Sequence, residues 1–159
     1  MDFFNQTGKL AIGSRLRMLT DKITVDAAAI YKMFGVDLKP KWFPVFFVLS
    51  RGEAKTITSI AKEIGHSHPS VSNIIKEMVA KGLVKETKDK SDGRRNMVML
   101  SAKGKRMSDS FSEQCIDVTA AIEQITQQTR NDLWEAIEEW ENLLLDKSLL
   151  ERVKEAKNE

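Results

Sequence analysis

Hydrophobic residues recur at helical spacing along most of the chain, and the pattern changes to alternation in one short stretch. A first long helix is predicted from about Gly8 to Phe34, with Gly35 as the left-handed residue that ends it. An apolar stripe about seven turns long is more than one small domain can cover, so part of this helix is expected to pack against a second copy. The stripe consists of Ile12, Leu16, Leu19, Ile23, Ala27, Ile30 and Phe34.

The most apolar run of the chain, residues 42–49, follows a polar linker and has Pro44 near its start. This pattern predicts the central core helix, ending near Gly52. Two interpretations of its aromatic residues stay open. Most of them fit the core, whereas Trp42 and Phe43, at the mouth of the helix, are the candidates for lining a ligand pocket.

Two shorter helices follow, joined by a tight turn at Gly65. Thr58 is the expected N-cap of the first helix and Ser67 that of the second, where Pro69 occupies the first turn. Gly82 is expected to stop the second helix. The expected buried positions are Ile60, Ala61 and Ile64 in the first helix, and Val71, Ile75, Met78 and Val79 in the second. The pair predicts a helix-turn-helix.

The second helix carries polar side chains on its outer face. Short hydroxyls, an amide and a cation suit phosphate oxygens and base edges, although a solvated face of an ordinary helical bundle explains the same pattern equally well. The candidate DNA contacts are Ser67, His68, Ser70, Ser72, Asn73 and Lys76.

A predicted β-hairpin decides between these interpretations. Residues 83–88 and 96–100 alternate like strands, and the polar, glycine-containing segment 89–95 reads as the tip. A hairpin directly after a helix-turn-helix is a wing, and a cationic tip can enter an adjacent minor groove. Arg94 and Arg95 are expected to make that contact.

With these elements in place, the sequence resembles the MarR family of winged-helix regulators. The motifs that carry the resemblance are GLV at 82–84, DKSDGRR at 89–95 and LSAKG at 100–104. The resemblance implies that Asp89 or Asp92 braces an arginine through a salt bridge. KWFP at 41–44 and GSRLRML at 13–19 look closer to a branch often fused to a GNAT acetyltransferase domain, which we do not expect here.

The expected fold class is mainly α with a small β-hairpin: a winged helix-turn-helix with N- and C-terminal dimerisation helices. We expect a single domain, with residues 40–101 as the winged-helix part and residues 1–36 and 102–159 as the helical dimerisation part. The resemblance implies a homodimer, and the opposite charges of the two ends of the chain fit a division of labour. Residues 1–106 carry twenty Lys/Arg and ten Asp/Glu, whereas residues 107–159 carry five and thirteen.

The C-terminal third predicts two amphipathic helices. Ser101 is the expected cap of the first, and a capping box from Thr129 to Asp132 is expected to open the second. Their apolar positions are Met107, Phe111, Cys115, Val118, Ile122 and Ile125, then Leu133, Ile137, Trp140 and Leu144. These helices have little to bury against within one subunit, which a two-fold dimer would remedy. Cys115, on an apolar face, is either inert core or a redox sensor.

No motif points to an enzyme, since the sequence has no phosphate-binding glycine loop, catalytic triad or HExxH. His66 and His68 lack neighbouring ligands, so neither a metal nor a cofactor is expected. One cysteine and no long apolar run indicate a cytoplasmic protein outside the membrane. We predict a transcription regulator, a ligand-responsive repressor that binds double-stranded DNA as a homodimer and responds to a small-molecule effector. The alternative is a winged-helix protein-interaction module without DNA binding.

Overall fold

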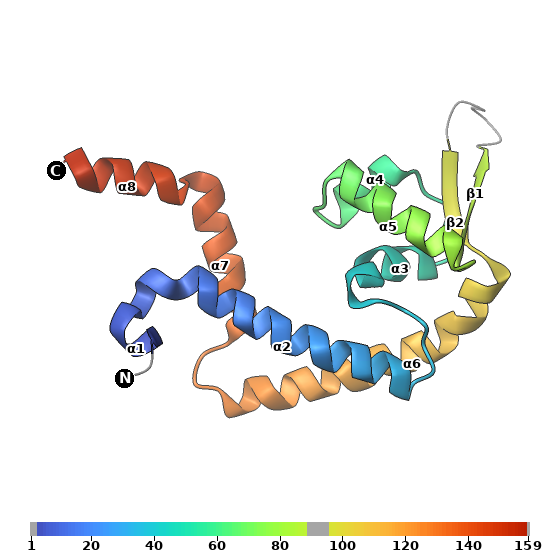
Figure 1. Cartoon of the computed structure of the whole chain (residues 1–159), viewed down its shortest axis with the longest axis horizontal. Coiled ribbons are helices and arrows are strands. Elements are labelled where there is room, and N and C mark those ends of the chain that lie inside the picture. Colours follow the sequence, from blue (N-terminus) through green and yellow to red (C-terminus); the bar gives the residue numbers. More distant parts are fainter. Residues whose placement is uncertain (1–2, 89–95, 159) are drawn as a thin grey trace. The chain divides into compact units, whose positions relative to one another are not determined.

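The computed structural model describes residues 3–88 and 96–158 (Figure 1). The chain divides into two compact units, Met1–Gln114 and Cys115–Glu159, and α6 (Ala102–Gln128) contributes to both. Among the described residues, no helix is both long and apolar enough to cross a membrane. The other elements of the first unit are α1 (Phe3–Thr7), η1 (Gly8–Ala11), α2 (Ile12–Met33), η2 (Pro40–Trp42), α3 (Phe43–Ser50), α4 (Ile57–Glu63), α5 (His68–Ala80), β1 (Val84–Lys88) and β2 (Asn96–Leu100).

The first predicted helix is present but begins with a 3-10 turn, η1, so its α-helical part starts at Ile12. Gly35 ends it as predicted, with φ +66°. The backbone N–H of Gly35 donates to the Lys32 carbonyl (3.2 Å) and that of Val36 to the Tyr31 carbonyl (2.8 Å), which satisfies carbonyls of the last turn. The predicted apolar stripe is largely on the surface, since Ile12, Leu16, Leu19 and Ile23 are exposed.

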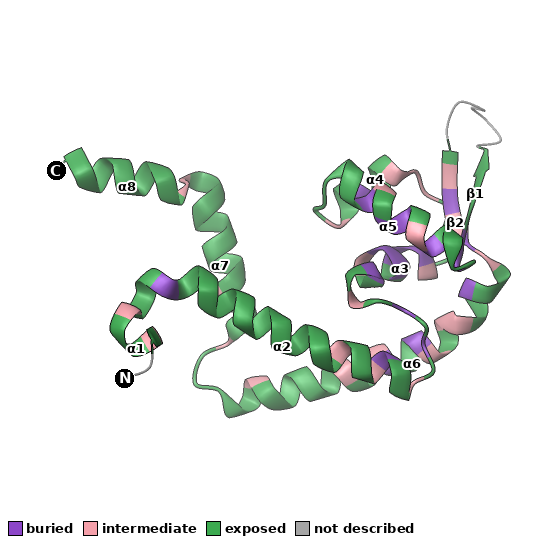
Figure 2. Ribbon diagram, in the orientation of Figure 1, coloured by how far each residue is buried: buried purple, intermediate pink, exposed green. Residues whose placement is uncertain are grey.

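The core of the first unit lies among α3, α4, α5, the two strands and the first part of α6 (Figure 2). The prediction of a central core helix over residues 42–49 is confirmed, because α3 buries Val45, Phe46, Val48 and Leu49 on one side. Phe46 meets Phe111 of α6 edge-on, with ring centroids 4.8 Å apart. The fully buried side chains include Trp42, Val45, Phe46, Leu49, Ile60, Val71, Ile75, Met78, Leu83, Val98 and Phe111.

The helix-turn-helix is formed by α4 and α5, with two corrections. The N-cap of α4 is Thr56 and not Thr58, because the Thr56 hydroxyl accepts the Ser59 N–H at 3.1 Å. Val79 is exposed, and Ile74 takes the expected place on the buried stripe of α5. These positions lie on opposite edges of the helix, so the buried face is rotated toward Ile74.

The predicted ends of α5 are confirmed. Ser67 is the N-cap, its hydroxyl accepting the Ser70 N–H at 3.4 Å. Gly82, with φ +69°, is the left-handed residue after the helix. Beyond it, the Leu83 N–H donates to the Met78 carbonyl at 3.0 Å, the bond that closes a Schellman motif.

The predicted hairpin is also confirmed. Strands β1 and β2 pair antiparallel, with Val84 opposite Leu100 and Lys88 opposite Asn96. Lys55 forms an isolated antiparallel bridge with Val98 of β2. The Lys55 N–H donates to the Val98 carbonyl (2.9 Å), and the Val98 N–H donates to the Lys55 carbonyl (2.7 Å). The tip lies outside the described residues, and with it the predicted residues Asp89, Asp92, Arg94 and Arg95.

A compact joint connects the end of α5 to the start of α6. Ser101 is the cap of α6, as predicted: its hydroxyl accepts the Gly104 N–H at 3.1 Å. The same hydroxyl donates to the Gly82 carbonyl (2.5 Å), and the Ser101 N–H donates to the Leu83 carbonyl (2.9 Å). A Cβ on Gly104 would collide with the Leu83 carbonyl oxygen and lie 3.2 Å from the Leu100 side chain. Only glycine therefore lets α6 approach this closely.

The second unit contains the rest of α6, α7 (Leu133–Asp146) and α8 (Leu149–Asn158). The predicted capping box at Thr129 is wrong. Asp132 is the N-cap of α7, its carboxylate accepting the N–H groups of Trp134 (2.8 Å) and Glu135 (3.2 Å). A capping box does occur at α8, where Ser148 and Glu151 bond to each other. The exposed apolar side chains of α7 are Leu133, Trp134, Ile137, Trp140, Leu143, Leu144 and Leu145.

Candidate nucleic-acid interface

The polar face of α5 is the candidate interface. Because Val71, Ile75 and Met78 are buried, the opposite side of the helix is turned to solvent. Of the predicted contact residues there, only Ser72 is half-buried. The exposed ones are Ser67, His68, Ser70, Asn73 and Lys76. The structure thus brings all six onto the outer surface of one helix and its N-cap, as a reading helix requires.

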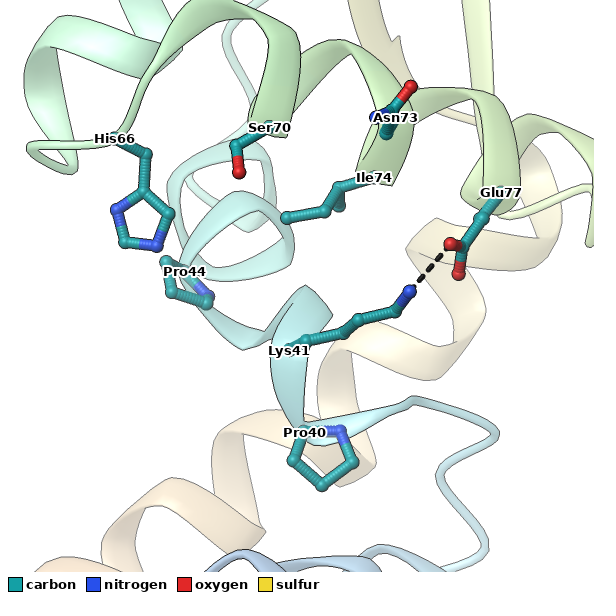
Figure 3. Close-up of a pocket in the computed structure, with 8 residues that line it drawn as sticks. All are labelled: Pro40, Lys41, Pro44, His66, Ser70, Asn73, Ile74 and Glu77. Atoms are coloured by element: carbon teal, nitrogen blue, oxygen red, sulfur yellow. Dashed lines mark hydrogen bonds and ion pairs between the residues drawn. The ribbon is translucent and has the colours of Figure 1, made fainter. Parts of the chain in front are cut away.

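A hollow of about 450 Å³ runs along one edge of this face (Figure 3). Ser70 and Asn73 lie on its α5 side, whereas Pro40, Lys41 and Pro44 come from η2 and the start of α3. His66, Ile74 and Glu77 complete the lining. The interface is therefore a helix face with a second segment beside it.

Glu77 joins that second segment to α5, and sequence reasoning missed it. Its carboxylate accepts from the Lys41 ammonium (2.5 Å), the Lys39 ammonium (3.2 Å) and the Trp42 indole N–H (3.0 Å). The hydrogen bond from Lys41, followed by those from Lys39 and Trp42, lowers the pKa of Glu77 to about 2. The carboxylate is therefore ionised at neutral pH and ties η2 to α5.

A second ionic cluster ties the hairpin to α4. The Lys55 ammonium lies 2.8 Å from a Glu63 carboxylate oxygen and 3.6 Å from one of Glu53. Its hydrogen bond to Glu63 outweighs desolvation and raises the pKa of Lys55. Since Lys55 also pairs with β2 through its backbone, the wing strands and the helix-turn-helix are held as one body.

The two residues proposed to line a ligand pocket have different surroundings. Trp42 is 1% exposed, whereas Phe43 is 40% exposed. The Phe43 ring centroid lies 5.7 Å from that of Phe47 and 5.8 Å from that of Phe111. Neither residue borders the hollow along α5 or a second one of about 240 Å³ between α3, β2 and α6.

Two other side chains that could be reactive, those of His66 and Cys115, lie in surroundings that favour a structural role. His66 places its Nδ1 2.8 Å from the Ile64 carbonyl, within the turn between α4 and α5. Burial raises the pKa of the Cys115 thiol, which disfavours the reactive thiolate. In the described part of the chain, no three His, Cys, Asp or Glu side chains gather as metal ligands would.

Comparison with known proteins agrees with this geometry. Residues 36–95 match the model of the MarR family. Curated protein sequences include no match to the chain. Three solved structures share the fold, each covering most of both chains. The transcriptional repressor CouR, bound to a 23-mer DNA duplex, is 20% identical with a TM-score of 0.64, covering 87% of this chain and 96% of its own.

The PcaV transcriptional regulator from Streptomyces coelicolor, in complex with its natural ligand, is 13% identical with a TM-score of 0.63, covering 86% of this chain and 92% of its own. A MarR family regulator from Neisseria meningitidis is 17% identical with a TM-score of 0.62, covering 96% and 99%. The matched segment contains η2, α3, the helix-turn-helix and the first wing strand. Residues 36–95 are thus similar to the MarR family of regulators, and the chain shares the winged helix-turn-helix fold of a solved MarR family regulator.

Proposed function

We propose that the protein is a ligand-responsive repressor that acts as a homodimer on a pseudo-palindromic DNA site. The observation that carries the proposal is the exposed polar face of α5, on a helix whose other side is buried and whose two ends are capped. Such a helix can enter a major groove without unfolding or rearranging. A protein that reads chromosomal DNA in this way acts where that DNA is, which keeps the cytoplasm as its expected location.

The contacts we propose divide by their chemistry. Asn73 is suited to a base edge, because its amide offers both a donor and an acceptor. The hydroxyls and the cation are suited to phosphate oxygens, which position the helix without reading sequence. The set is Ser67, His68, Ser70, Ser72, Asn73 and Lys76 on α5 and its N-cap, with Arg94 and Arg95 as the wing contact and Asp89 or Asp92 as the salt-bridge partner of an arginine.

The exposed apolar side chains of α2 and α7 support the homodimer. Trp134 is 72% exposed and Trp140 is 53% exposed, and α2 presents four large apolar side chains of its stripe to solvent. Patches of this kind mark interaction surfaces. With two-fold symmetry, two reading helices would meet half-sites about one helical turn apart.

Regulation would require an effector that binds one spacing of the reading helices better than another, since equal affinity shifts nothing. The PcaV structure contains its natural ligand, and CouR is named a repressor, which makes ligand-responsive repression the natural proposal for this chain. Phe43, whose ring lies against those of Phe47 and Phe111, is the pocket residue we would test first, followed by the buried Trp42.

The proposal is tested by selecting a duplex from a random pool with the wild-type protein and measuring variants on it. Asn73→Ala should relax preference at one or two base pairs by about 1–3 kcal/mol. Arg94→Ala should weaken binding to all sequences alike. Asn131→Ala, before α7, is the matched control and should leave both affinity and preference unchanged.

Two results would count against the proposal. Unchanged preference in Asn73→Ala would remove α5 from the reading role. Absence of any binding by the wild-type protein to duplex DNA at low salt would favour the protein-interaction module instead, because the electrostatic contribution to DNA binding is largest there.

A further inference from the structure

We propose that Lys39 and Lys41, which flank the buried Trp42 beside α5, form an additional contact to the DNA phosphate backbone. This inference rests on the proposed placement of α5 in a groove.

The segment that carries the two lysines is fixed to the protein. Trp42 is buried, and its indole N–H donates to Glu77 of α5 at 3.0 Å. The Trp42 backbone N–H donates to the Lys39 carbonyl at 2.8 Å, and the Lys39 ammonium lies 5.0 Å from the centre of the Trp42 ring. Lys39 and Lys41 therefore flank an anchored side chain, and their positions relative to α5 are set before any DNA arrives.

The ion pairs of Lys39 and Lys41 with Glu77 do not neutralise all of the positive charge. One carboxylate, Glu77, faces two ammonium groups, so the cluster of Glu77, Lys39 and Lys41 has a net charge of +1. The side chains of Lys39 and Lys41 are 54% and 56% exposed. Each ammonium has three N–H donors, and the bond to Glu77 uses one of them. Donors on both lysines are thus available to an anion from solvent.

The position of the cluster indicates which anion this is. Lys41 and Glu77 line the same hollow as Ser70 and Asn73 (Figure 3). A duplex that offers its bases to Asn73 carries its phosphates along the edges of the groove, next to that hollow. One ammonium is enough to neutralise Glu77, so the second leaves a positive charge beside the hollow that a phosphate group can neutralise. A free phosphate ion has the same chemistry and is the competing source.

The test is the salt dependence of binding to the selected duplex, measured by fluorescence anisotropy on folded variants with matching circular dichroism. Each phosphate contact contributes about 0.9 to the slope of log K against log salt. Lys39→Gln and Lys41→Gln should each lower the slope by about 0.9, and the double variant by about twice that. Between 50 and 200 mM salt, each single variant should then lose about 3.5-fold less affinity than the wild type.

Three further variants separate charge from structure. Lys41→Arg should have the salt slope of the wild type, because it keeps the positive charge. Glu77→Gln should keep or steepen the slope, since it removes the only negative charge of the cluster, whereas a purely structural ion pair would make it behave like the lysine variants. Lys157→Gln, in the last turn of α8, should change nothing. Base preference should be the same in all of them.

The outcomes distinguish this inference from the function it rests on. Unchanged slopes in both lysine variants, with Asn73→Ala still altering preference, would overturn the inference alone. Failure of the wild type to bind duplex DNA would overturn both. A rise in melting temperature with inorganic phosphate that the double variant loses, together with an unchanged DNA slope, would assign the cluster to a free anion and overturn the DNA contact.

Discussion

At the scale of single residues, Glu77 joins α5 to donors 35 to 38 positions earlier in the chain. Its depressed pKa makes the joint pH-dependent. A carboxyl group whose pKa falls on folding stabilises the folded state fully above its unfolded value, 4.5, and this contribution is lost as the pH falls through about 2. Glu77→Gln should therefore lower the stability at pH 7, and the difference from the wild type should shrink between pH 4.5 and 2.

Urea unfolding of both proteins at several pH values measures this difference. A stability difference that stayed constant down to pH 2 would show that the Glu77 carboxylate is not the group that Lys41, Lys39 and Trp42 stabilise. No sequence pattern marks this cluster, because helical periodicity identifies which positions are buried and says nothing about which distant polar groups meet at the edge of the buried face.

Gly104 makes a second residue-scale prediction. A Gly→Ala change within a helix ordinarily stabilises it, by roughly 0.5–1 kcal/mol. At Gly104 the sign should reverse, to a loss of about 1–3 kcal/mol, because the new methyl group meets the Leu83 carbonyl. Gly13→Ala in α2 is the matched control, since nothing lies within 4 Å of the added Cβ there. Chemical denaturation measures the change in unfolding free energy of both variants. Equal changes would contradict the close approach of α6 to the Leu83 carbonyl.

At the scale of elements, the sequence was most informative where a helix end has its own chemistry. Ser67 and Gly82 bound α5 as predicted, and alternation located both strands, because these signals are local. The N-caps of α4 and α7 were misplaced, since each region offers two polar residues and only the backbone geometry selects one. The capping box at Ser148 has the usual residue pair, a serine followed three positions later by a glutamate.

The corrected N-cap of α7 can be tested directly. Asp132→Ala removes the acceptor of two backbone N–H groups, so it should cost about 0.5–2 kcal/mol, whereas Asp132→Asn should retain most of the stability. Thr129→Ala serves as the comparison and should have a smaller effect, because Thr129 bonds to carbonyls of Thr126 and Asn131 and caps no helix. Thermal unfolding followed by circular dichroism measures the stabilities of the three variants. A larger loss of stability in Thr129→Ala than in Asp132→Ala would identify Thr129 as the N-cap.

At the scale of the whole molecule, the proposed homodimer gives the sharpest prediction. Ile23 belongs to the apolar stripe of α2, so Ile23→Glu would place a carboxylate in a dimer interface. An unpaired buried charge costs well over 1.4 kcal/mol, and the dimer dissociation constant should rise at least about tenfold. Val25→Glu changes another exposed apolar residue of α2, off the stripe, and is the control. Sedimentation velocity measures both, and a wild-type monomer at micromolar concentration would contradict the proposal.

How much of the candidate site was predictable also differs with scale. The polar face of α5 followed from spacing alone, because one helix carries it. The second segment at Lys39 and Lys41 did not, because its position depends on burial of Trp42 against α5. The wing tip was predicted from composition and lies outside the described residues, so its contacts stay a prediction.

For the proposed dimer on DNA, the joint at Ser101 and Gly104 has a consequence for the spacing of the two half-sites. Hydrogen bonds from Ser101 and the close approach at Gly104 make α5 and the first turns of α6 a single lever. Adding one base pair between two half-sites rotates the far one by roughly 35° about the duplex axis. Because α5 and the first turns of α6 are held as one rigid body, α5 cannot turn relative to α6 to follow that rotation. Binding to a site with an inserted base pair must then depend on bending of the DNA or on conformational change in another part of the protein.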